Sequence, residues 1–143
     1  MGRSRLGYIS SSNTGTVING GIVAYGVATG GSAISPDPTV DGVVYRVLQF
    51  DSTSTLTVTT PGLFDVLIFG GGGSGAGSSS NNPSGGGGAG GVAQATTYLT
   101  TDTTVTVGAG ASAGPYPGTG SAIDSSIKSI GAAGGGYGGG TSG

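Results

Sequence analysis

The fold of this 143-residue chain is decided by residues 63–91, LFDVLIFGGGGSGAGSSSNNPSGGGGAGG. An apolar run with the character of a β-strand enters a tract, residues 70–91, in which 12 of 22 positions are glycine. A second cluster closes the sequence, with 8 glycines in the 13 residues 131–143. Glycine loses more backbone freedom on folding than any other residue. An ordered domain built this way must therefore gain from the missing side chains, through close backbone packing or flat surface loops.

The composition is unusual for a free enzyme. Only 34% of the residues are hydrophobic, 6% are aromatic and 7% are charged, and the net charge is −2. The thin apolar content leads us to expect burial between subunits, and the low charge suits a protein held in a larger assembly. A disordered glycine-rich filler is the alternative, which the well-patterned segments between the tracts disfavour.

Few residues could carry chemistry. The chain has no Cys, His or Glu, which removes disulfides and thiolate metal sites. Its six Asp are scattered singly, mostly beside Gly, Pro, Ser or Thr, as in Asx turns, and none has the spacing of a calcium loop. Four basic residues in all disfavour nucleic-acid binding. We expect no catalytic residue, no cofactor and no metal; an enzyme using a carboxylate pair assembled in space is a minor alternative.

One motif resembles a dinucleotide-binding loop. Residues 70–75, GGGGSG, fit G-x-G-x-x-G directly after an apolar strand. That site also needs a helix next and an acidic residue about 20 positions on. Residues 76–83 cannot form a helix, and the first acid is Asp102. A P-loop is excluded too, because its Gly-Lys-Ser/Thr is missing and the only lysine is Lys128.

The rest of the chain has the pattern of short strands. Alternating and β-branched residues, with turn signals about every ten positions, predict an all-β fold, a jelly-roll-like β-sandwich. No window has helical periodicity. Asn19-Gly20-Gly21 predicts a hairpin. Residues 63–69 form the most apolar strand and are expected to be central. The expected strands are residues 16–18, 22–27, 43–50, 56–59, 63–69, 92–99, 103–107, 122–123 and 127–130.

These signals divide the chain into an N-terminal arm (1–12), an N-terminal β segment (13–53) and a glycine-rich β-sandwich domain (54–143). The arm is either a floppy terminus or an extension that docks on a neighbouring subunit through Arg3, Arg5 and Tyr8. It lacks the apolar core of a signal peptide, and no apolar run reaches membrane-spanning length. We therefore expect the protein to be made and assembled in the cytoplasm.

The glycine tracts predict a specific packing. Runs such as residues 70–73 and 85–88 can form polyproline-II helices. Without side chains, several such helices can lie side by side, joined by backbone hydrogen bonds. Their loops would then present candidate recognition residues, with the tyrosines suited to stacking on sugars: Asn81, Asn82, Tyr116 and Tyr137.

From about residue 54 onward, the order of segments resembles the glycine-rich domain of bacteriophage virion proteins, especially tail fibres. The glycine-rich domain of anaplastic lymphoma kinase receptors has a similar layout. The resemblance implies a β-sandwich with glycine helices and a surface, non-enzymatic role. It is carried by residues 56–58, 61–73, 85–93 and 103–110, by Ser121 and by residues 132–136, and residues 1–53 have no counterpart in it.

The function expected on these grounds is that of a phage virion structural protein, all-β and homotrimeric. Two roles compete. The small size favours a capsid decoration or head-fibre protein that contacts other virion proteins such as the major capsid protein. The resemblance and the tyrosine-bearing loops favour a tail-fibre protein or adhesin that binds a host-surface receptor or glycan. A free carbohydrate-binding module is a further alternative. Neither nucleic acid nor a membrane is expected as a partner.

Overall fold

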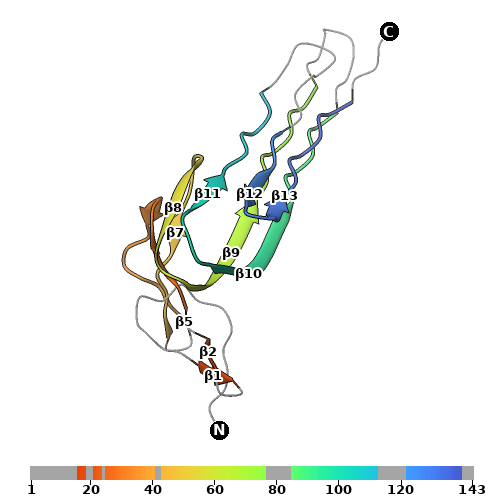
Figure 1. Cartoon of the computed structure of the whole chain (residues 1–143). Coiled ribbons are helices and arrows are strands. Elements are labelled where there is room, and N and C mark those ends of the chain that lie inside the picture. The colour runs from red at the N-terminus through yellow and green to blue at the C-terminus, as the bar shows by residue number, and fades with distance from the viewer. Residues whose placement is uncertain are drawn as a thin grey trace, which may run out of the picture. The chain divides into compact units, whose positions relative to one another are not determined.

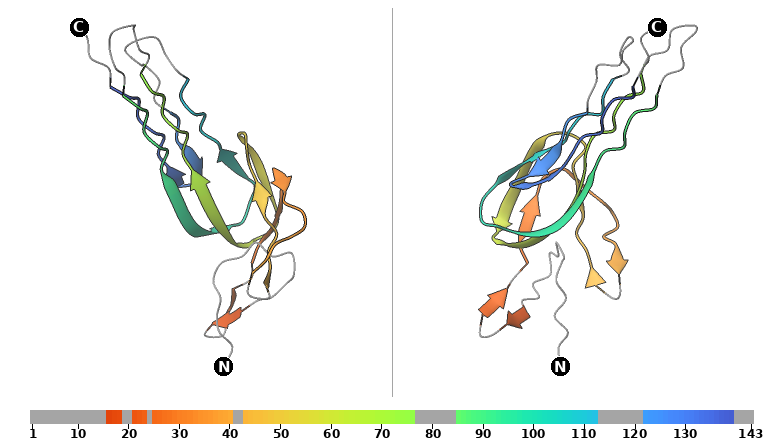
Figure 2. Two further views of the ribbon diagram at one scale, coloured as in Figure 1. Left: turned by 180° about the vertical axis from the view of Figure 1, so that it is seen from behind. Right: turned by 90° about the vertical axis from the view of Figure 1, so that its right-hand side faces the viewer.

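The computed structural model describes residues 16–18, 21–23, 25–40, 43–76, 85–112 and 122–139, which form an all-β structure (Figures 1 and 2). Within these ranges there are thirteen strands, no helix and no closed barrel. The predicted all-β class is therefore confirmed. The strands are β1 (Thr16–Ile18), β2 (Gly21–Val23), β3 (Val27–Thr29), β4 (Ser32–Ala33), β5 (Thr39–Val40), β6 (Val43–Val44), β7 (Leu48–Gln49), β8 (Ser54–Thr60), β9 (Gly62–Phe69), β10 (Val92–Leu99), β11 (Thr103–Thr106), β12 (Ser125–Ile127) and β13 (Ile130–Ala132).

The strands form one larger sheet and several pairs. The larger sheet has five strands in the order β13-β12-β11-β8-β3. The two-stranded sheets are β1-β2, β4-β7, β5-β6 and β10-β9. β1 and β2 pair antiparallel, with Thr16 opposite Val23, which confirms the hairpin predicted from the Asn-Gly signal.

Contacts divide the chain into two compact units. The strand unit consists of Met1–Val66 and Gln94–Thr104, and the glycine unit of Leu67–Ala93 and Val105–Gly143. The strands β9, β10 and β11 each begin in one unit and end in the other.

The strand unit is built around a small apolar core. Phe64 and Leu99 are fully buried, and Leu56 and Ala28 are nearly so. Gly26 donates a 3.0 Å hydrogen bond to the Leu63 carbonyl, which brings its backbone against the Phe64 ring. A Cβ at Gly26 would overlap that ring, so close approach explains this glycine.

Two aspartates in the strand unit hold residues that are distant in sequence. Asp102 accepts a 2.9 Å hydrogen bond from the backbone N–H of Val58. Asp65 accepts a 2.5 Å hydrogen bond from the hydroxyl of Thr96. Asp102 lies in the connection between β10 and β11 and ties it to β8, whereas Asp65 lies within β9 and ties it to β10. The prediction that the scattered aspartates serve local turns is therefore wrong for Asp65.

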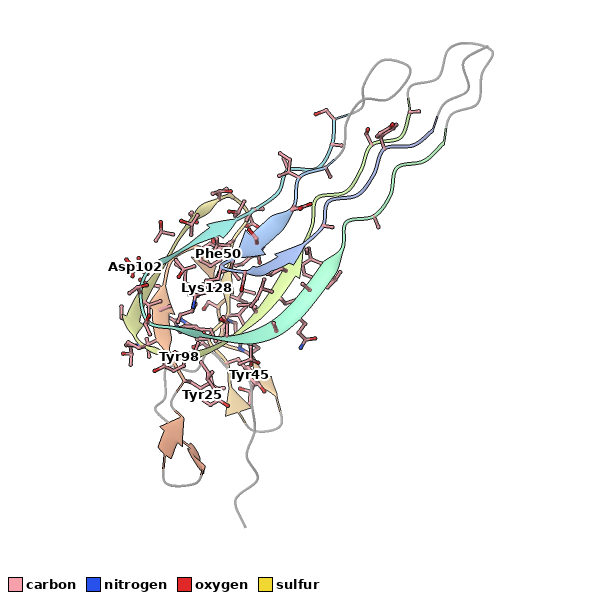
Figure 3. All side chains as sticks on the ribbon, turned by 45° about the vertical axis from the view of Figure 1, so that its right-hand side comes forward. Tyr25, Tyr45, Phe50, Tyr98, Asp102 and Lys128 are labelled. Atoms are coloured by element: carbon pink, nitrogen blue, oxygen red, sulfur yellow. The ribbon has the colours of Figure 1, made fainter. Side chains whose placement is uncertain are left out.

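In the glycine unit, β12 and β13 form a tight antiparallel hairpin next to β11. Val105 lies opposite Ile127, and Ser125 lies opposite Ala132. The turn places Lys128 at φ 54°, in the left-handed region (Figure 3). The single strand predicted at residues 127–130 is therefore a turn between two strands.

The strand predicted at residues 43–50 is also divided, into β6 and β7. Its backbone changes partners: Tyr45 donates to the Pro38 carbonyl at 2.8 Å, whereas the Val47 carbonyl accepts from Ile34 at 3.1 Å. One alternating run thus pairs first with β5 and then with β4. Alternation alone does not reveal such an exchange.

Candidate functional site

The most distinctive surface of the glycine unit is made by three glycine segments that lie side by side (Figures 1 and 2). The first glycine segment, residues 70–76, follows β9. The second, residues 85–91, precedes β10, and the third, residues 133–139, follows β13. Figure 3 shows how few side chains these segments carry, and none of their residues is charged.

Backbone hydrogen bonds join the segments at every third residue. The first donates to the second at 2.8–3.1 Å, through Gly70 to Gly91, Gly73 to Gly88 and Ala76 to Gly85. The second donates to the third at 2.7–2.9 Å, through Gly85 to Gly139, Gly88 to Gly136 and Gly91 to Ala133. Partner numbers fall as donor numbers rise, so both pairs are antiparallel. The repeat of three is that of a polyproline-II helix.

The third segment donates hydrogen bonds back to the first, so the three segments form a closed cycle of donors and acceptors, which we call the donor ring. Gly135 donates to Gly71 at 2.8 Å, and Gly138 donates to Ser74 at 2.9 Å. These partner numbers rise together, so the first and third segments are parallel. Each segment thus gives its hydrogen bonds to the next, and the last gives to the first. The expectation that glycine tracts lie side by side through backbone hydrogen bonds is confirmed for these residues.

The first glycine segment lies innermost in this arrangement. Beyond the ring it contacts residues 108–112 and 122–124, since Gly71 donates to Ile123 at 3.2 Å and Ala111 donates to Gly72 at 2.9 Å. Residues 122–123 were predicted to be a strand, but they join the glycine segments instead. Gly71 and Ser74 are accordingly buried.

Two classes of glycine occur in the three segments. In the first class, a Cβ would lie closer than 3.0 Å to backbone atoms of another of the three segments; these are Gly70, Gly73, Gly85, Gly87, Gly90, Gly135 and Gly138. In the second class, a Cβ would meet nothing within 4 Å; these are Gly72, Gly86, Gly136 and Gly139. Residues three apart face the same way in a polyproline-II helix. Alanine already occurs three residues away from two of the open glycines: Ala89 follows Gly86, and Ala133 precedes Gly136.

The first class must be glycine because neighbouring backbones lie so close, and not because the chain adopts a conformation that only glycine allows. Among the described residues, glycines at positive φ are Gly30 and Gly31, which lie in the strand unit. The three glycine segments contain none. Their glycines are needed because neighbouring backbones occupy the space that a side chain would fill.

Side chains anchor the segments at their strand ends. Asp124 accepts a 2.7 Å hydrogen bond from the N–H of Gly134, at the start of the third segment. The Ser125 hydroxyl accepts a 2.9 Å hydrogen bond from the N–H of Gly108. Sequence reasoning treated Asp124 as a turn residue and missed this role; its only signal was a position shortly before a glycine tract.

One predicted recognition residue falls on these segments. Tyr137 lies in the third segment with 55% of its surface exposed. The other candidates for assembly or recognition lie outside the described residues: Arg3, Arg5, Tyr8, Asn81, Asn82 and Tyr116.

The surface of the three glycine segments consists mainly of peptide groups. No group of three or more Asp, Glu, His or Cys is placed among the described residues to hold a metal ion. A search of the same residues finds no helix long and apolar enough to cross a membrane. What the segments offer is an uncharged surface of peptide groups at regular spacing.

A family model described as a glycine-rich domain matches residues 50–143, which include all three glycine segments. The chain belongs to this family. No curated protein and no solved structure gives a significant match. The ring of hydrogen bonds thus lies wholly within the glycine-rich domain.

Proposed function

We propose that this protein is a bacteriophage virion structural protein, a cement-like capsid decoration or head-fibre protein on the particle surface. It would act as a homotrimer, with its strands arranged as a jelly-roll-like sandwich, and its partner would be another virion protein such as the major capsid protein. The resemblance of residues 54–143 to glycine-rich domains of phage virion proteins supplies the setting. The uncharged surface and thin apolar content are consistent with a protein held in an assembly.

The observation that carries the proposal is the donor ring of the glycine segments. Backbone hydrogen bonds at every third residue tie together three stretches of chain that carry almost no side chains. Such a structure is held together by peptide groups, and Ser74 and Tyr137 are the only residues of the three segments with a polar side chain. That property suits a structural element better than an enzyme.

The experiment is a comparison of particles with and without the protein. We expect a reconstruction of the particle to place density for this chain on the capsid surface. We also expect particles that lack it to release their genome at lower temperature, and purified protein to restore heat resistance. Density at the tail, or identical heat resistance with and without the protein, would overturn the decoration role.

Tyr137 favours a second candidate, a tail-fibre protein or adhesin that binds a host-surface glycan. Tyr137 is 55% exposed, on a segment otherwise nearly free of side chains. A tyrosine that is partly exposed to solvent combines an apolar ring with a polar hydroxyl, which suits contact with a ligand. Glycan-array binding that is lost in Tyr137→Ala and kept in Tyr137→Phe would support this role. The absence of any binding to glycans or host cells would exclude it.

A further inference from the structure

On one side of the second glycine segment, no described residue is a hydrogen-bond partner. Every third residue of it, starting at Gly85, both donates to the third segment and accepts from the first. Four residues between these have neither N–H nor C=O bonded to another described residue: Gly86, Gly87, Ala89 and Gly90. We call these four residues the open edge. They repeat with the same period as the paired residues, about 9 Å for three residues of polyproline II.

The open edge is also bare of side chains. A Cβ at Gly86 would meet nothing within 4 Å, and Ala89 is exposed and carries only a methyl group. The third segment is different, because the exposed ring of Tyr137 stands on it. A second backbone can therefore approach the open edge closely at Gly86 and Ala89, while Gly87 and Gly90 turn their Cβ positions toward the first segment. On the third segment, Tyr137 obstructs such an approach.

Exposed apolar side chains continue the surface beyond the open edge. Val92 follows Ala89 by three residues and is 62% exposed. Phe69, 61% exposed, lies beside it, because the adjacent residues Gly70 and Gly91 are joined by a 2.8 Å hydrogen bond. A glycine edge alone is too narrow for the ~800 Å² per partner of a stable interface. The side chains of Val92 and Phe69 add apolar area next to the open edge and so enlarge the surface that a partner can cover.

We propose that a glycine segment from a second copy of this chain docks along the open edge. The occupant must offer peptide groups every three residues, no bulky side chains and no charge. The chain's own second segment meets all three conditions, and this chain already pairs such segments. Each copy would donate to the next, as the three segments do within one chain, so three copies can close a ring. The inference rests on the proposed assembly of identical subunits and names the surface that forms it.

The test compares two substitutions that add the same charge at equally open glycines. Gly86→Arg blocks the open edge. Gly136→Arg is the matched control, since a Cβ there also meets nothing within 4 Å. By light scattering after size exclusion, wild type and Gly136→Arg are expected at three times the 13.3 kDa chain mass, and Gly86→Arg at the monomer mass. Circular dichroism should be unchanged in both variants.

Hydrogen exchange gives a second measurement. In assembled wild type, the amides of the open edge should exchange at least tenfold more slowly than in monomeric Gly86→Arg. A wild type that is monomeric at high concentration overturns the inference, as does a Gly86→Arg that still assembles. So does protection of the open edge only when capsid protein is added, because another protein then occupies it. If Gly86→Arg is monomeric but wild type is absent from particles, the inference stands and the virion role fails.

Discussion

Replacing Gly73 with alanine tests whether close backbone contact holds the glycine segments. A Cβ at Gly73 would lie 2.7 Å from the carbonyl carbon of Gly136 and 2.9 Å from that of Gly135, and closer still to the Gly136 oxygen. Real Cβ atoms do not approach backbone within 3.0 Å. The third segment must therefore move away from the first.

The magnitude follows from the hydrogen bonds that this movement disturbs. Nearest the clash are three of the bonds between the third segment and its two neighbours: Gly88 to Gly136, Gly135 to Gly71 and Gly138 to Ser74, all 2.8–2.9 Å long. Each contributes a net ~0.5–1.5 kcal/mol, and forcing extra volume into a close-packed site costs ~1–3 kcal/mol. We expect Gly73→Ala to lower the free energy of unfolding by about 3 kcal/mol, out of the ~5–15 kcal/mol of a typical domain.

Gly136→Ala makes the same chemical change where a Cβ meets nothing within 4 Å. It should leave stability unchanged or raise it by up to ~1 kcal/mol, because alanine restricts the unfolded chain. Urea unfolding followed by circular dichroism measures both, and the thermal midpoints should differ by roughly 10 °C. Equal midpoints for the two variants would refute the reasoning, since close approach would then not be what excludes a side chain at Gly73.

Three further results are expected. Asp124→Ala should cost about 1 kcal/mol by removing the acceptor for the Gly134 N–H, and Asp124→Asn, which keeps an oxygen there, should recover most of it in denaturant titrations. Gly26→Ala should destabilise by ~1–3 kcal/mol through its clash with the Phe64 ring; in a double-mutant cycle, Phe64→Leu should relieve part of that cost, and strict additivity would argue against the clash. In the monomeric state, amide exchange across residues 85–91 should be slow at every third residue and fast between.

The sequence predicted those features that local pattern governs. Val92–Leu99 was expected as a strand and has those bounds as β10, because its alternation is unbroken and a glycine tract precedes it. The hairpin before Val23 followed from its turn residues. The side-by-side packing of the glycine tracts was predicted because runs of glycine have no side chains and can pack only through their backbone.

The remaining features depend on partners distant in sequence. Gly72 and Gly73 are identical neighbours, yet only at Gly73 would an added Cβ meet another backbone, and nothing local distinguishes them. Asp102 bonds to a strand 44 residues earlier in the chain. The most apolar strand, β9, was expected to be central. Among the described residues its sheet partner is β10, and its one other pairing is an isolated bridge from Tyr25 to Leu63. In each of these three cases the structure depends on which distant part of the chain packs next to the residue or strand.

Because the glycine segments repeat every three residues, the position of a residue within its triplet decides which neighbouring segment it faces. Deleting one residue after Gly70 would turn every later residue to a different neighbour, so that donors would face water and open positions would face backbone. Adding three residues to a segment keeps each residue facing the same neighbouring segment and lengthens the segment by about 9 Å. The length of this part of the protein can therefore change over time only in matched steps of three, taken together in all segments of the ring.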